Sequence, residues 1–63
     1  MADDTVASVA ELYLGNILYA LELAAMSLES QAKDDDAAYY RGIARKLAEA
    51  RGMDRSRAAS QGT

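Results

Sequence analysis

The chain has 63 residues, of which 51% are hydrophobic and 27% are charged, and its formal net charge is -3. A chain of this length forms one small domain and has no residues left for a second core. It contains no cysteine and no histidine, which excludes disulfides and the zinc or haem sites that depend on those side chains.

The composition favours helices throughout. Proline is absent, glycine occurs four times and alanine occurs 14 times, so little interrupts a helix and few residues favour a strand. We therefore predict an all-α fold. Because alanine side chains are small, their helices must approach closely to gain packing energy. The expected architecture is a helical hairpin, with a long first helix and a short second one, that assembles as a homodimeric helical bundle.

The N-terminal sequence carries no targeting signal that we recognise. It is acidic at Asp3-Asp4, where a secretory signal would be positively charged. The most apolar stretch, residues 12–28, is interrupted by Glu22 and by Gly15-Asn16, so it falls short of the roughly 20 apolar residues that span a bilayer. We expect a cytoplasmic protein that does not enter a membrane.

The first helix is predicted over residues 5–33, with Asp4 or Thr5 as its N-cap. A seven-residue repeat runs along it, as in helices that pack through one seam. The repeat consists of Ala7, Leu14, Leu21 and Leu28, with Ala10, Ile17, Ala24 and Gln31 three positions later. Gly15-Asn16 is a favoured turn sequence, and a break there would give three helices. We favour the unbroken helix because the repeat passes through Gly15 without a shift.

The second helix is predicted over residues 37–51. The run Asp34-Asp35-Asp36 ends the apolar pattern and supplies N-cap residues, while Gly52 stands where a C-cap glycine is expected. We assign residues 1–52 to one helical hairpin domain and residues 53–63 to a flexible polar tail.

The two predicted helices differ in length, which leads to a prediction of self-association. At 1.5 Å per residue the first would be roughly 43 Å long and the second roughly 22 Å, so the second leaves half of the first uncovered. A second copy of the chain is expected to cover that half. The residues predicted for the dimer interface are Val6, Val9, Ala10, Tyr13, Leu14, Ile17 and Leu21.

Charge is divided between the two halves of the chain. Up to Asp36 there are eight acidic residues against Lys33, whereas from Ala37 onward six basic residues face two acidic ones. The simplest interpretation is that a basic second helix packs beside an acidic first helix.

No group of residues indicates catalysis. A general base at neutral pH would have to be a carboxylate, and none stands beside a second polar group in an apolar setting. Glu22 and Glu29 are expected on a solvated helix face, and residues 34–36 lack the spacing and the glycine of a calcium loop. We expect a protein that is not an enzyme and that holds no cofactor or metal.

The aromatic residues suggest a surface for another protein. All four are tyrosines, and Tyr13 and Tyr40 are expected in the core while Tyr19 and Tyr39 stay accessible. The expected function is therefore that of an acidic, self-associating regulator of the inhibitor, anti-activator or co-chaperone type. The candidate partner-binding residues are Leu12, Tyr19, Met26, Tyr39, Arg41 and Arg45.

The alternative is a small dimeric regulator that binds nucleic acid through its basic second helix and tail. The residues that would carry this function are Arg41, Arg45, Lys46, Arg51, Arg55 and Arg57. An overall pI near 4.6 argues against general affinity for polyanions. The outline of a short helical hairpin is similar to that of dimeric regulators from plasmids and phages, but no motif here identifies a family.

Overall fold

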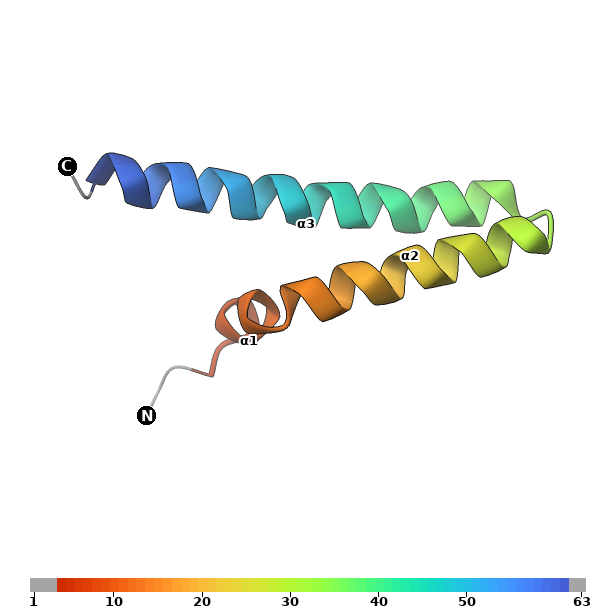
Figure 1. The fold of residues 1–63 in the computed structure, drawn as a ribbon, viewed down its shortest axis with the longest axis horizontal. Coiled ribbons are helices and arrows are strands. Elements are labelled where there is room, and N and C mark those ends of the chain that lie inside the picture. Colours follow the sequence, from red (N-terminus) through yellow and green to blue (C-terminus); the bar gives the residue numbers. More distant parts are fainter. Residues whose placement is uncertain (1–3, 62–63) are drawn as a thin grey trace.

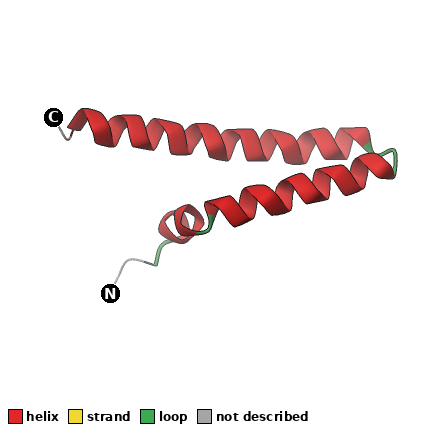
Figure 2. Ribbon diagram, viewed as in Figure 1, coloured by secondary structure: helices red, strands yellow, loops and turns green. Residues whose placement is uncertain are grey.

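The computed structural model describes residues 4–61, with side chains described as far as residue 55. Over these residues the chain forms three helices, α1 (Val6–Leu12), α2 (Leu14–Ser30) and α3 (Asp34–Gln61), and no strand (Figure 1). The connections between the helices are short (Figure 2). The predicted all-α fold is confirmed.

A reciprocal cap starts α1 at the predicted position. The backbone N–H of Ser8 donates to Oγ1 of Thr5 at 3.0 Å, and the backbone N–H of Thr5 donates to Oγ of Ser8 at 3.1 Å. This capping box satisfies donors that would otherwise lack partners at the first turn. It matters because α1 has only seven residues and would be unstable alone.

The unbroken first helix predicted over residues 5–33 is wrong. The chain bends by 77° between α1 and α2, and the break falls at Tyr13, two residues before the Gly15-Asn16 pair that could have signalled it. The backbone of Tyr13 still bonds on both sides, donating to the carbonyl of Val9 at 3.1 Å and accepting from Ile17 at 2.9 Å. These bonds survive the bend, which brings α1 beside α3 so that side chains of both helices line one pocket.

A tight turn at residues 31–33 reverses the chain. Ala32 has a positive φ of 62°, and its N–H donates to the carbonyl of Glu29 at 2.9 Å. The N–H of Lys33 donates to the carbonyl of Leu28 at 2.8 Å. These two bonds and the left-handed residue between the helices form a Schellman motif, which ends α2.

After the turn, α3 runs antiparallel to α2 (Figure 1). Ala25 of α2 and Ala37 of α3 are the two buried apolar residues of the described chain, with 0% and 1% exposure. Their small side chains allow the backbones to approach closely near the turn, as the alanine-rich composition predicted.

The helix predicted over residues 37–51 corresponds to α3, which is longer at both ends than predicted. It begins at Asp34 with all three aspartates in its first turn, where carboxylates interact favourably with the helix dipole. It continues through Gly52, whose φ is not positive, so the predicted C-cap at this residue is wrong. The segment 53–61, assigned above to a flexible tail, is helical in its backbone, and residues 62 and 63 lie outside the described range.

The predicted difference in helix length is therefore reversed. With 28 residues α3 is about 42 Å long, whereas α2, with 17 residues, is about 26 Å long. The premise of a long first helix with a short companion is wrong. The uncovered apolar surface that was inferred from this length difference is nevertheless present.

Candidate protein-binding surface

The described part of the chain has almost no core. No large side chain in it is fully buried, and the two buried apolar residues are alanines. Ten large apolar side chains are exposed. They are Val6, Val9, Leu12, Tyr13, Tyr19, Leu23, Met26, Tyr39, Tyr40 and Met53.

The total exposed area also indicates that the chain has little core. A compact folded chain of 6.8 kDa exposes about 4,000 Å² of surface. This chain exposes 5071 Å². The excess of about 1,000 Å² is comparable to what one partner buries in a standard protein interface.

One exposed apolar surface lies on α2. Tyr19, Leu23 and Met26 are 67%, 47% and 53% exposed, and the helical repeat of 100° per residue places them on the side that faces away from α3. We call these three residues the outer stripe. The charged residues of α2, Glu22 and Glu29, both turn toward α3 and bind Arg41. The outer stripe is therefore apolar and uncharged.

The bend at Tyr13 changes which residues share this surface. On a straight helix Leu12 would stand in one row with Tyr19 and Met26, as predicted. In the bent chain Leu12 lies beyond the break and lines a groove that Leu18 and Gly15 also line. Leu23 was missed, although its spacing of four residues from Tyr19 and three from Met26 could have identified it.

A second surface lies along the seam between α2 and α3 near the turn. We call it the tyrosine groove. Its lining residues are Ala24, Ser27 and Leu28 of α2, and Asp36, Tyr39 and Tyr40 of α3. The two tyrosine rings pack edge to face, with centroids 5.7 Å apart. Tyr40 was expected in the core, but it is exposed at the margin of this groove. Tyr39 was expected to be accessible and is, yet it stands apart from Tyr19, on the other helix.

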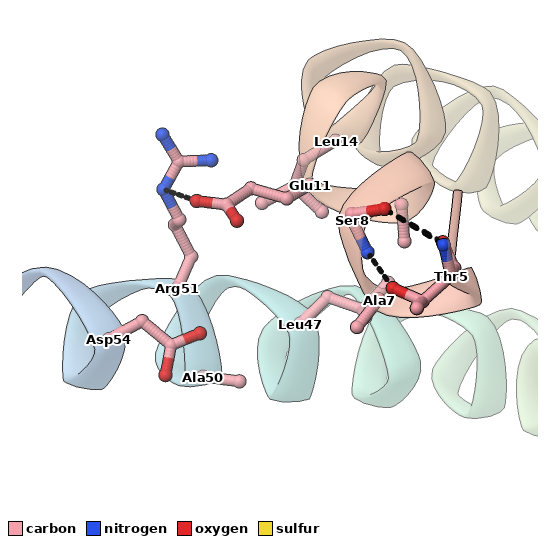
Figure 3. Close-up of a pocket in the computed structure, with 10 residues that line it drawn as sticks. Thr5, Ala7, Ser8, Glu11, Leu14, Leu47, Ala50, Arg51 and Asp54 are labelled. Atoms are coloured by element: carbon pink, nitrogen blue, oxygen red, sulfur yellow. Dashed lines mark hydrogen bonds and ion pairs between the residues drawn. The ribbon is translucent and has the colours of Figure 1, made fainter. Parts of the chain in front are cut away.

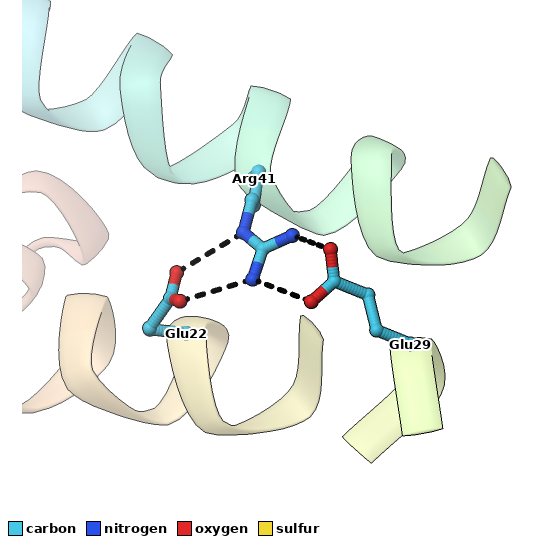
Figure 4. A network of polar contacts seen from close by, with 3 residues as sticks. All are labelled: Glu22, Glu29 and Arg41. Atoms are coloured by element: carbon cyan, nitrogen blue, oxygen red, sulfur yellow. Dashed lines mark hydrogen bonds and ion pairs between the residues drawn. The ribbon is translucent and has the colours of Figure 1, made fainter. Parts of the chain in front are cut away.

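The opposite side of the same seam is polar. The guanidinium of Arg41 donates Nε and Nη2 to the two carboxylate oxygens of Glu22, at 3.3 and 3.1 Å, and it also binds Glu29 (Figure 4). The hydrogen bond from Arg41 lowers the pKa of Glu29, and the two carboxylates raise that of Arg41. Arg41, a predicted partner-binding residue, is thus engaged within the chain, whereas Arg45 is exposed.

At the open end of the helix pair, side chains of α1 reach α3, although no residue of α1 is buried. Side chains from both helices line a pocket there, and Nε of Arg51 is 3.7 Å from a carboxylate oxygen of Glu11 (Figure 3). Together with Arg41, this ion pair joins the basic second half of the chain to the acidic first half, in agreement with the charge pattern.

The seven residues predicted for a dimer interface fall into two groups. Val6, Val9 and Tyr13 are exposed. The other four are half-buried within the chain, and they are Ala10, Leu14, Ile17 and Leu21. The bend therefore gives part of the predicted seam an intrachain neighbour and leaves the rest uncovered.

Other kinds of site have less support. Within the described residues no three carboxylates come together as they would to hold a metal ion. No single helix in that range is long and apolar enough to cross a membrane, and α1 with α2 meets the requirement only as a bent pair.

The fold and its surfaces define a small all-α protein whose apolar residues lie mostly at the surface. Comparison with protein-family models, with curated proteins and with solved structures finds no match for this chain.

Proposed function

We propose that this chain is a non-catalytic, self-associating helical protein that binds another protein. One observation carries the proposal: no large side chain is fully buried in the described chain, while ten large apolar side chains are exposed. Fully burying one such side chain contributes about 1.5–3 kcal/mol, and a domain's total stability is only about 5–15 kcal/mol. Association supplies the burial that the single chain lacks.

The outer stripe of α2 is the surface that we assign to the other protein. Tyr19, Leu23 and Met26 have the spacing of the contact residues of a helix that lies in an apolar groove. Tyrosine contributes a large contact area with few rotatable bonds, and methionine adapts to uneven surfaces. With no charged group to desolvate on the stripe, binding costs little. An inhibitor, an anti-activator or a co-chaperone would use such a surface.

The alternative, nucleic-acid binding, has weaker support. Arg41 and Arg51 are paired with carboxylates of the same chain, so they offer less charge to a phosphate backbone. Arg45 and Lys46 have no carboxylate partner among the described residues, and they would carry any such binding.

Light scattering after size exclusion tests self-association. We expect a mass of at least twice 6.8 kDa at micromolar concentration. A monodisperse, helical monomer would contradict the proposal.

Affinity capture from the native host tests the partner surface. Tyr19→Ala and Leu23→Ala should each abolish recovery of one stoichiometric protein, while Lys33→Ala, a control at an exposed residue of the turn, should not. Arg45→Ala tests the alternative, because loss of its salt-sensitive retention on a duplex DNA column would instead support nucleic-acid binding.

A further inference from the structure

The exposed side of α3 contains a hollow around Gly42. Four of the residues that line it, Tyr39, Gly42, Ile43 and Lys46, stand at spacings of three, four and seven residues, and the others are Ala38, Arg45 and Glu49. A Cβ built on Gly42 would meet no atom within 4 Å, so the hollow is open. Four residues at this spacing form the hole that receives one side chain of a neighbouring helix in knobs-into-holes packing.

Tyr39, itself one of these four residues, is also the side chain that would enter the corresponding hollow of a second copy. Tyr39 is 67% exposed, and its ring is held by edge-to-face contact with Tyr40. A ring supported in this way loses little conformational freedom when it is buried. The hollow and the aromatic side chain therefore lie within one turn of each other on the same helix, which is the arrangement that a two-fold axis requires.

Building on the self-association proposed above, we infer that two copies pack antiparallel along α3, with Tyr39 of each copy in the Gly42 hollow of the other. The two-fold axis then passes close to residue 41 of both helices. This register places Asp36 of each copy opposite Lys46 of the other, so the dimer contains two such pairs.

The charges along α3 favour this direction. Three carboxylates, Asp34 to Asp36, occupy its first turn, while Lys46 has no carboxylate partner among the described residues. A parallel pair would bring six carboxylates together at one end. The antiparallel pair keeps them apart and gives Asp36 a cation.

The whole chain exposes about 1,000 Å² more than a compact chain of its mass, which is more than the roughly 800 Å² that each partner buries in a standard interface. Packing along α3 covers Tyr39 and Ile43, and it leaves the outer stripe on the far side of α2. One assembly can therefore pair with itself and still present the outer stripe to another protein, once on each copy.

Oxidative cross-linking tests the direction, because the chain contains no cysteine of its own. Asp36→Cys and Lys46→Cys chains are oxidised separately and as an equal mixture. We expect a disulfide-linked dimer in the mixture and little in either chain alone. Leu23→Cys, on the outer stripe, is the control and should not cross-link.

The other outcomes separate this inference from the proposed function. Cross-linking of each chain with itself, and not in the mixed combination, would show a parallel dimer, which overturns the inference and leaves self-association standing. A helical monomer without any cross-link would overturn both.

A matched pair of glycine variants tests the hollow. Gly42→Leu fills it, whereas Gly52→Leu adds the same side chain two to three turns away, where a Cβ also meets nothing within 4 Å. By sedimentation equilibrium, Gly42→Leu should raise the dimer dissociation constant at least tenfold and Gly52→Leu less than twofold. Equal effects would remove the hollow from the interface. Far-UV circular dichroism should show both variants to be helical, since each replaces a glycine with a better helix former.

Discussion

Arg41 of α3 binds Glu22 of α2 through two parallel hydrogen bonds, from Nε at 3.3 Å and from Nη2 at 3.1 Å. The same guanidinium donates to Glu29, seven residues further along α2 (Figure 4). One planar group therefore links two turns of α2 to α3 and fixes their register on the side of the seam away from the tyrosine groove.

Arg41→Lys should weaken this link although it conserves the charge. A lysine ammonium is a single point of charge and cannot bond both carboxylates in the plane of a guanidinium. Because the pairs are solvent-exposed, we expect a fall of only about 2–4 °C in the melting temperature. Arg45→Lys, at an exposed site without an ion pair, is the control and should leave the melting temperature unchanged. Equal shifts in the two variants would contradict the assigned role.

The lowered pKa of Glu29 predicts a dependence on pH. The hydrogen bond from Arg41 is the main cause, desolvation opposes it and the charge of Arg41 adds to it. A lowered pKa means that the pairing stabilises the folded chain above the usual value of 4.5, and that this contribution is lost as the pH falls through the lowered value.

Thermal melts of the native chain and of Glu29→Gln check this dependence. The native chain should be the more stable at neutral pH, and the difference should shrink toward zero as the pH falls below the lowered pKa of Glu29. Added salt should reduce the difference at neutral pH, since the group is exposed. A difference that persists unchanged into acid would show that the carboxylate's charge is not what stabilises the pair.

Local signals in the sequence predicted the helical class, the cap at Thr5 and the charge match between the two halves of the chain. They offered a turn signal at Gly15-Asn16, but they could not place the bend at Tyr13, two residues earlier. A tyrosine carries no turn signal, and the backbone bonds on either side of it survive the bend. The bend is accompanied by the Glu11–Arg51 pair between α1 and α3, and a contact between such distant residues is not visible in a local pattern.

The helix ends also could not be predicted from residue type alone. Gly52 has the residue type expected at a C-cap, yet it lies inside α3, whereas Ala32 takes the left-handed position at the end of α2. A glycine costs a helix only about 1 kcal/mol, so it permits an end without imposing one. The turn after α2 is set by the packing of the two helices, and it imposes the left-handed conformation on an alanine. The outer stripe was only partly predicted, because the bend removes Leu12 from it and the helical spacing of Leu23 was overlooked.

Ala32→Gly should stabilise the chain. An alanine at φ 62° pays a steric penalty that glycine avoids, and the Schellman bonds at this position do not involve its side chain. After allowing for the greater freedom of glycine in the unfolded chain, we expect a gain of about 0.5–1 kcal/mol in the free energy of unfolding.

Urea unfolding at matched protein concentration measures this gain, with Ala20→Gly as the control. Ala20 is an exposed residue inside α2, so its replacement should cost about 1 kcal/mol. A loss of stability in both variants would mean that residue 32 is not held in the left-handed region.

Gly52→Ala should raise stability by about 0.5–1 kcal/mol, and the sign of its effect decides where α3 ends. Inside a helix, with no atom within 4 Å of the new Cβ, alanine is the better residue. At a left-handed C-cap the same change would instead be destabilising. Urea unfolding and far-UV circular dichroism should therefore show a more stable chain with at least as much helix. Gly15→Ala, at an equally open site near the start of α2, supplies the size of the effect for a glycine within a helix. If Gly15→Ala stabilises the chain while Gly52→Ala destabilises it, then α3 ends near residue 51 in solution and the segment after it is not helical.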